Sequence, residues 1–342
     1  MIVRSKAPLR LGLAGGGTDV SPYSDLYGGL VLNATINLYA YCIIEEISGD
    51  SIEINSYDSG SVEILPKTDF LSINGKSSLI KGVYNRIVKD FNPDIPPFKI
   101  TTYNDAPPGS GLGSSSTMVV AVIKAFSEWL SLPLGDYDMA QLAYMVERKD
   151  LNFSGGKQDQ YAATFGGFNY MEFLKDDLVI VNPLKIKRWI VDELESSMLL
   201  YFCGKSRSSA DIIDEQKRNT LDKNFAAIEA MHKIKQHALD MKLAILKGDM
   251  DSFAGIIRES WENKKKMASS ITNQTIQEAM EVALSAGAKA GKVSGAGGGG
   301  FIMFVMDPAL RVRVESALSA LDGRLMPFQF SEGGAHGWKI YK

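Results

Sequence analysis

Hydrophobic residues in the first half of the chain mostly follow the pattern of β-strands. β-Branched and aromatic residues crowd 31–47, and two short alternating runs between 51 and 65 flank a turn at 58–60. These patterns predict extended strands joined by tight turns. Apolar residues at every third or fourth position predict a helix over 77–91, and the prolines that follow end it before a strand at 98–103.

Helical periodicity dominates the rest of the chain, with short apolar runs between the helices. The predicted helices are, in chain order, 117–130, 138–150, 208–220, 222–247, 250–268, 273–287 and 308–321. Strands are predicted at 168–173, 178–181, 198–202 and 301–306, and in a closing pair that ends at 341. Strands and helices are mixed rather than strictly alternating, which predicts an α+β fold in both halves.

The length of 342 residues exceeds what one hydrophobic core usually supports, so we expect two domains, over 1–185 and 186–342.

A formal charge of −3 provides no general attraction to nucleic acid. The two cysteines and three histidines lack the spacing of metal ligands, which disfavours a zinc enzyme or a histidine-dependent hydrolase. We also expect no membrane segment and a cytoplasmic location, because no apolar run reaches the length needed to span a bilayer.

A glycine- and serine-rich loop between a predicted strand and a predicted helix carries the clearest chemistry. Its glycines allow tight turns and close approach of the backbone to a ligand. Free N–H groups and the positive end of the following helix favour a phosphate there, and the hydroxyls can cap the helix, bind phosphate or ligate Mg²⁺. The residues assigned to binding phosphate are Pro108, Gly109, Ser110, Gly111, Leu112, Gly113, Ser114, Ser115 and Ser116.

Two well-known phosphate-binding motifs do not fit this loop. No Lys-Ser/Thr pair follows its last glycine, and the spacing and position of a dinucleotide fingerprint are both wrong. A serine-capped turn without a ligand is the alternative. A second glycine cluster at 294–300 is expensive to order, which favours close backbone packing against a ligand or another loop over a flexible hinge.

Three charged residues could contribute to phosphoryl transfer. Such transfer needs one carboxylate to hold Mg²⁺ and another to orient or deprotonate the acceptor, and Glu147 and Asp159 lie twelve residues apart across the break at 154–156. Arg10 lies within an apolar alternating run and could stabilise charge on the transferring group. Taken singly, Glu147 is better explained as a helix-surface charge, Asp159 as a cap or turn residue, and Arg10 as an edge salt bridge.

Three motifs follow one another along the chain: the segment 7–19, the Pro-x-x-x-Gly-Leu-Gly-Ser-Ser motif at 108–116, and the glycine motif at 292–301. In this order they resemble the motifs of the GHMP kinases, a superfamily that includes galactokinase, homoserine kinase and mevalonate kinase. The resemblance covers essentially the whole chain. It implies an N-terminal domain like the second domain of ribosomal protein S5 and a ferredoxin-like C-terminal domain, with ATP and substrate meeting between them.

The resemblance also implies roles for individual residues. Ser115 and Glu147 would hold Mg²⁺, Asp159 would be the catalytic base, and Arg10 would lower the pKa of the acceptor hydroxyl and stabilise the transition state. ATP and Mg²⁺ are the implied cofactors. The glycines of the second cluster would lie against the ligands, and we include Gly297 and Gly298 among the substrate-binding residues.

The first motif departs from galactokinase, where a Glu-His pair stands in place of Gly16 and Gly17. Thr18 and Asp19 remain, and Gly16, Gly17, Thr18 and Asp19 are all included among the substrate-binding residues. Loss of a carboxylate and a side chain suits a larger acceptor, or one that already carries a phosphate. This motif resembles the sugar 1-kinase branch that contains heptose 7-phosphate kinases and bacterial fucokinases. Candidate cations for the phosphate of such an acceptor are Lys157, Lys205 and Arg207.

We therefore expect an ATP-dependent kinase that phosphorylates the anomeric hydroxyl of a sugar phosphate, most simply a heptose 7-phosphate. The alternatives are a kinase for a free sugar such as fucose or galactose, and a catalytically silent sugar sensor. The long helices in the second half could also form a homodimer, although they could equally cover their own sheet.

Overall fold

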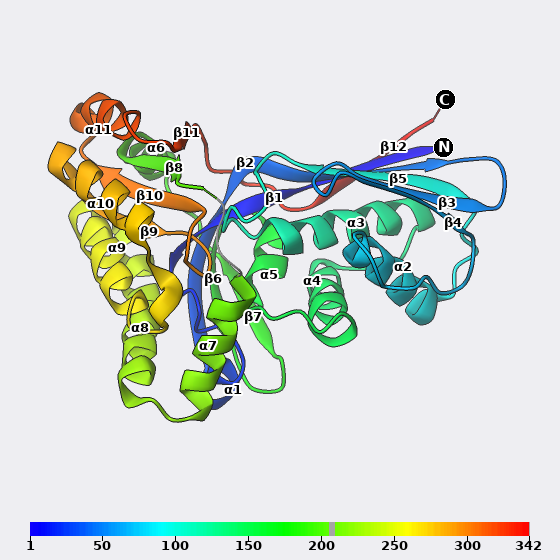
Figure 1. The fold of residues 1–342 in the computed structure, drawn as a ribbon, viewed down its shortest axis with the longest axis horizontal. Helices are drawn as coiled ribbons and strands as arrows, with labels where there is room; N and C mark the ends of the chain where they lie inside the picture. The colour runs from blue at the N-terminus through cyan, green and yellow to red at the C-terminus, as the bar shows by residue number, and fades with distance from the viewer. Residues whose placement is uncertain (205–208, 342) are drawn as a thin grey trace.

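The computed structural model describes residues 1–204 and 209–341. It contains an eight-stranded and a four-stranded sheet with helices packed against both (Figure 1). The elements in chain order are β1 (Ile2–Ala14), α1 (Tyr23–Tyr27), β2 (Gly29–Glu46), β3 (Ser51–Ser56), β4 (Ser61–Pro66), α2 (Ser78–Phe91), β5 (Phe98–Asn104), α3 (Ser114–Leu130), α4 (Asp136–Met145), the π-helical turn η1 (Val146–Asp150), α5 (Gln158–Phe165), β6 (Phe168–Phe173), β7 (Val179–Pro183), α6 (Arg188–Ser197), β8 (Met198–Phe202), α7 (Ser209–Leu221), α8 (Phe225–Lys247), α9 (Met250–Lys264), the 3₁₀ turn η2 (Ser269–Ile271), α10 (Gln274–Ala286), β9 (Ala288–Val293), β10 (Phe301–Met306), the 3₁₀ turn η3 (Pro308–Leu310), α11 (Arg311–Leu318), β11 (Arg324–Met326) and β12 (His336–Ile340).

The larger sheet is organised around two long strands, β1 and β2. Its order is β12-β1-β2-β5-β3-β4, and β6 and β7 extend it from the other end of β2. Strand β2 pairs with β5 through residues 40–46 and with β6 through residues 29–34, so one strand serves two neighbours along its length. Helices α2 to α5 lie on one face of this sheet (Figure 1).

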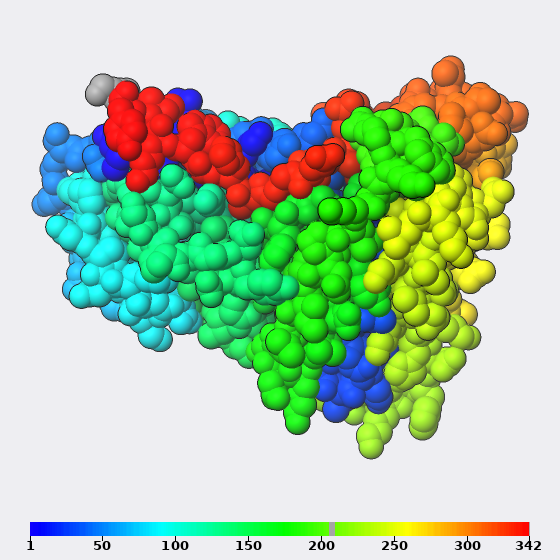
Figure 2. All heavy atoms as spheres, turned by 180° about the vertical axis from the view of Figure 1, so that it is seen from behind, coloured from blue at the N-terminus to red at the C-terminus, as the bar shows by residue number. Residues whose placement is uncertain are grey.

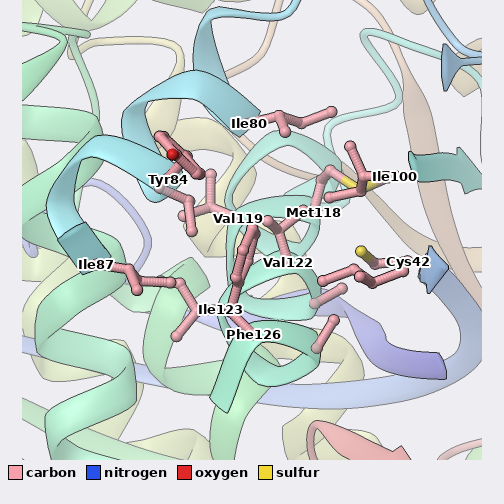
Figure 3. Close-up of a cluster of buried hydrophobic side chains, with 14 of the residues drawn as sticks. Cys42, Ile80, Tyr84, Ile87, Ile100, Met118, Val119, Val122, Ile123 and Phe126 are labelled. Atoms are coloured by element: carbon pink, nitrogen blue, oxygen red, sulfur yellow. The ribbon is translucent and has the colours of Figure 1, made fainter. Parts of the chain in front are cut away.

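Helix α3 begins at the predicted phosphate loop and is buried along most of its length. Its apolar residues pack between the sheet and α2, which places the start of the helix rigidly. Figure 3 shows this part of the core, in which the labelled side chains are Cys42, Ile80, Tyr84, Ile87, Ile100, Met118, Val119, Val122, Ile123 and Phe126.

The smaller sheet is antiparallel, with the order β11-β8-β10-β9. Its core is continuous with one end of the larger sheet, because Leu11 and Leu13 of β1 belong to the same buried cluster as Leu200 of β8, Ile257 of α9 and Met303 of β10. The two halves of the chain thus share hydrophobic packing. This mixed helix and strand arrangement confirms the predicted α+β class.

The structure confirms the two predicted closing strands, but they do not pair with each other. Strand β11 pairs with β8 in the smaller sheet, whereas β12 pairs with β1 in the larger one, where Val3 lies opposite Lys339. In Figure 2 the red C-terminal segment crosses from the second half to the blue and cyan end of the first. A short strand pattern does not encode its partner, and the open edge of β1 accepts this one. The division near residue 185 stays a prediction, with β12 returning to the sheet of the first half.

Sequence periodicity also missed the short helix α1, strand β9 and helix α6. Strand β9 has the sequence Ala-Lys-Ala-Gly-Lys-Val, in which Val293 is the single β-branched residue and no aromatic residue occurs. Its pairing with β10 and its burial make it a strand nevertheless. Helix α6 occupies the region where only a domain boundary was expected.

Candidate active site

A cavity of about 310 Å³ lies where the end of β1, the loop before α3 and the loop after β9 meet η1, the turn before α5, and helices α7 and α9. Most of the residues predicted for catalysis and binding line it. These are Arg10, Gly16, Gly17, Asp19, Gly109, Gly111, Gly113, Ser114, Ser115, Ser116, Glu147 and Asp159. Segments far apart in the sequence therefore converge on one site.

The loop before α3 is held by backbone hydrogen bonds on both sides. The N–H of Arg10 donates to the carbonyl of Leu112 at 3.1 Å, and the N–H of Phe301 donates to the carbonyl of Ser110 at 2.9 Å. Ser110 and Leu112 are buried, so they shape the loop from behind. Gly113, in the left-handed region at φ +77°, leads into the first turn of α3, where Ser114 and Ser115 line the cavity.

The two glycine-rich loops pack backbone against backbone. A Cβ atom at Gly111 would lie 2.6 Å from the carbonyl oxygen of Ser294, and one at Gly295 would lie 2.6 Å from the carbonyl oxygen of Gly111. Glycine is required at both positions, since such distances exclude any side chain. Gly297 and Gly298 contact Ile271 instead and do not line the cavity, whereas Gly295 and Ala296 do.

Arg10 and Asp159 form a close ion pair in the cavity. The Nε and Nη2 atoms of Arg10 both lie 2.6 Å from Oδ1 of Asp159. The Nη1 atom donates to the carbonyl of Gly111 at 2.7 Å, which ties the pair to the glycine- and serine-rich loop at 108–116, hereafter the serine loop. Arg10 is only 4% exposed, so solvent screens its charge little. A carboxylate and a cation are thus held next to the position expected for a phosphate.

Glu147 is 1% exposed and projects from the π-helical turn η1 toward the start of α3. Its carboxylate accepts a hydrogen bond from Ser116 Oγ at 3.0 Å and another from Gln160 Nε2, and Arg148 Nη1 lies 3.5 Å from Oε1. The hydroxyl in contact with Glu147 is thus that of Ser116. Ser115, the predicted partner in holding Mg²⁺, is exposed and lines the cavity.

Asp19 and Thr18 organise the backbone around the cavity. Asp19 accepts hydrogen bonds from the backbone N–H of Lys157 at 2.9 Å and of Gln158 at 3.1 Å, and so anchors the start of α5, one residue before Asp159. The hydroxyl of Thr18 is fully buried and bonds to backbone atoms of Gly15 and Leu30. Asp19 faces the cavity, whereas Thr18 lies behind it.

Lys157 lies on an adjoining cavity of about 450 Å³ rather than on the main one. It is 2% exposed, and its Nζ atom lies 2.7 Å from Oδ1 of Asp177 and 3.5 Å from Oδ1 of Asp25. Two other predicted cations, Lys205 and Arg207, lie outside the described residues.

Sequence reasoning missed Lys264, which lines the main cavity from the last turn of α9. The helical periodicity could have indicated this lysine. One buried face of α9 is formed by Phe253, Ile257, Trp261 and Lys264, so a lysine occupies a position where the periodicity predicts an apolar residue.

Comparison with known proteins agrees with this geometry. The model of the GHMP kinases N-terminal domain matches residues 78–167, and that of the GHMP kinases C-terminal domain matches residues 241–322. The chain belongs to the GHMP kinase family. This confirms the resemblance seen in the three motifs and the two-domain GHMP kinase fold.

Individual GHMP kinases resemble the chain along its whole length. It is 47% identical to D-glycero-alpha-D-manno-heptose 7-phosphate kinase of Campylobacter jejuni over 99% of both chains. A solved structure described as a D-glycero-D-manno-heptose 1-phosphate kinase from Bacteroides thetaiotaomicron is 62% identical, with a TM-score of 0.86 over 99% of this chain and 100% of that one. The L-fucokinase/L-fucose-1-P guanylyltransferase of Bacteroides fragilis is 28% identical over 93% of this chain and 36% of its own length.

Within the described residues, no helix is both long enough and apolar enough to cross a membrane.

Proposed function

We propose that the protein transfers the γ-phosphoryl group of ATP to the anomeric hydroxyl of D-glycero-D-manno-heptose 7-phosphate, with the 1,7-bisphosphate and ADP as products. The full-length match to the Campylobacter heptose 7-phosphate kinase carries this proposal. The Arg10–Asp159 pair in the main cavity supports the same chemistry. Such a product would serve the synthesis of nucleotide-activated heptose, and the use of ATP supports a cytoplasmic location.

In the proposed reaction, Asp159 accepts the proton of the anomeric hydroxyl. The hydroxyl oxygen forms a bond to the γ-phosphorus as the bond from that phosphorus to the bridging oxygen of ADP breaks. Arg10 faces the same region and would stabilise the negative charge on the transferring group. The free N–H groups at the start of α3 and the hydroxyls of Ser114 and Ser115 would hold the phosphates of ATP.

The oxygen atoms of Ser115 and Glu147 suit Mg²⁺, which prefers hard oxygen ligands. Three neighbouring donor groups contact the Glu147 carboxylate, and a carboxylate accepts about four hydrogen bonds, so it retains capacity for a metal. When bound, Mg²⁺ would neutralise phosphate charge. Ser116 would then fix the Glu147 side chain while Ser115, on the cavity wall, completes the pair.

The sugar would bind in the part of the main cavity that Gly16 and Gly17 line, because these two glycines add no side chains to the wall. Asp19, one of the predicted substrate ligands, faces the same space. Lys157 would contribute through the adjoining cavity, although Asp25 and Asp177 already neutralise its charge.

A direct test compares acceptors. We expect turnover with heptose 7-phosphate and none with free fucose or galactose; the reverse preference would replace the proposed substrate. Asp159→Asn should lower kcat by about 10²- to 10⁴-fold while calorimetry shows ATP binding unchanged within a few-fold. Asp192→Asn, which alters an exposed carboxylate on α6, is the matched control. Near wild-type turnover of the Asp159 variant would refute its role as the base.

A further inference from the structure

Three cations among the described residues line the main cavity: Arg10, Arg148 and Lys264. Two of them have carboxylate partners, since Arg10 pairs with Asp159 at 2.6 Å and Arg148 lies 3.5 Å from Glu147. Lys264 has no carboxylate oxygen within 4.0 Å in the part of the chain that the structure describes. Its positive charge is therefore the uncompensated one in the cavity wall.

Lys264 is held by the backbone of the second glycine loop. Its Nζ atom donates to the carbonyl of Gly295 and, at 3.4 Å, to that of Val293. An ammonium group has three N–H donors, so these two contacts leave one for a ligand. The side chain is only 6% exposed and is among those that line the cavity, and the two carbonyls do not neutralise its charge.

Such an arrangement is unfavourable in the empty protein. Burial, reinforced by the positive charge of Arg10, lowers the pKa of Lys264 to about 7, against an opposing effect from Asp19. Lys292 of β9 is a second buried cation close by, and burial together with Lys264 and Arg10 lowers its pKa as well. Buried charges without partners are rare in proteins, and they concentrate at sites where a ligand supplies the missing charge.

The position of Lys264 favours the acceptor over ATP. Besides the main cavity, it lines a small one of about 20 Å³ in which no residue at 109–116 takes part; the walls of this second cavity include Arg10, Gly12, Gly15, Gly16 and Gly295. Lys264 thus borders the loop after β1 at Gly15 and Gly16, while Gly295, which holds it, separates it from Gly111 of the serine loop. The phosphates of ATP are expected at the serine loop itself.

We propose that Lys264 is a specificity-determining residue that binds the phosphate group carried by the sugar acceptor. This inference rests on the proposed function, because it assumes that the acceptor enters already phosphorylated. The ligand that completes the site is then an anion, and its charge compensates the ammonium when the two meet. An uncharged sugar leaves Lys264 as it is in the empty protein and gains no binding energy from its charge, so only the phosphorylated acceptor benefits from this residue.

Equilibrium binding measured by calorimetry without ATP tests the proposal separately from turnover. The probes are heptose 7-phosphate and the free heptose. Lys264→Met should weaken binding of heptose 7-phosphate by about 10- to 100-fold, the usual range for a hydrogen bond to a charged group, and change binding of the free heptose little. Lys264→Gln, which keeps a donor for the Gly295 carbonyl but removes the charge, should weaken binding of heptose 7-phosphate to the same extent.

Lys266→Met is the matched control, because Lys266 is exposed two residues further on and should leave both affinities unchanged. Binding of a non-hydrolysable ATP analogue should be the same in all variants. Unchanged affinity for heptose 7-phosphate in Lys264→Met, an equal loss for both sugars, or a loss confined to the ATP analogue would overturn the proposal. So would failure of the wild type to bind heptose 7-phosphate, whereas binding without turnover would refute only the proposed function.

Discussion

Replacing Gly111 with alanine should damage both the stability of the protein and its binding of ATP. Gly111 has φ +75°, a left-handed conformation that costs a residue with a side chain about 1–2 kcal/mol. The new Cβ would also lie 2.6 Å from the carbonyl oxygen of Ser294, closer than real Cβ contacts. Forcing such a contact into packed structure costs about 1–3 kcal/mol more. The expected loss in the free energy of unfolding is therefore about 2–5 kcal/mol.

Gly60 offers a control that separates these two costs. It has φ +60° in the turn between β3 and β4, and a Cβ there meets nothing within 4 Å. Gly60→Ala should lose only about 1–2 kcal/mol and leave ATP affinity unchanged. Urea unfolding gives the stabilities, and calorimetry gives the affinity for an ATP analogue, which should weaken in Gly111→Ala as the serine loop shifts. Equal stability losses in the two variants would refute the argument that the two glycine loops pack rigidly together.

Three further predictions concern charged groups of the cavity. Because the pKa of Lys264 falls from 10.5 in the unfolded chain to about 7 in the folded protein, the unfolded chain binds more protons between those values. The free energy of unfolding should then rise with pH across this window, and Lys264→Met should reduce the rise in urea titrations at about pH 7 and 9. Asp19→Asn should lower stability by about 1–3 kcal/mol and kcat with it, since the start of α5 loses a charged hydrogen-bond acceptor; unchanged thermal unfolding would contradict this. Glu147→Gln should raise the Mg²⁺ concentration needed for half-maximal rate, and an unaltered Mg²⁺ dependence would exclude Glu147 as a ligand.

Much of the local structure followed from the sequence because it depends on neighbouring residues. Alternation and helical periodicity predicted most strands and helices, and the structure confirms strands β6 and β7, which pair with each other, and helices α7 to α10. The glycines at 109, 111 and 113 all adopt positive φ, as a tight loop that approaches other groups requires. The three motifs and their order along the chain were also sufficient to reveal the resemblance to the GHMP kinases.

The active-site contacts depend on how distant segments pack, and the sequence could only suggest them. Arg10 and Asp159 are 149 positions apart, and their 2.6 Å contact exists because β1 and α5 meet beneath the serine loop. The same packing brings the Ser116 hydroxyl, rather than that of Ser115, against Glu147. Adjacent serines at the start of a helix point in different directions, and only the position of η1 determines which of them Glu147 contacts.

The sequence by itself determined the class of chemistry, because glycine conformations and side-chain types are properties of each residue. Only the tertiary structure decided where charge is left unbalanced. In the folded protein Lys264 lies buried near Arg10 with no carboxylate partner among the described residues. The two halves of the chain share one hydrophobic core, and β12 pairs with the edge of β1. These features arise from contacts between residues far apart in the chain, and a linear pattern does not encode which of its charges will find a partner.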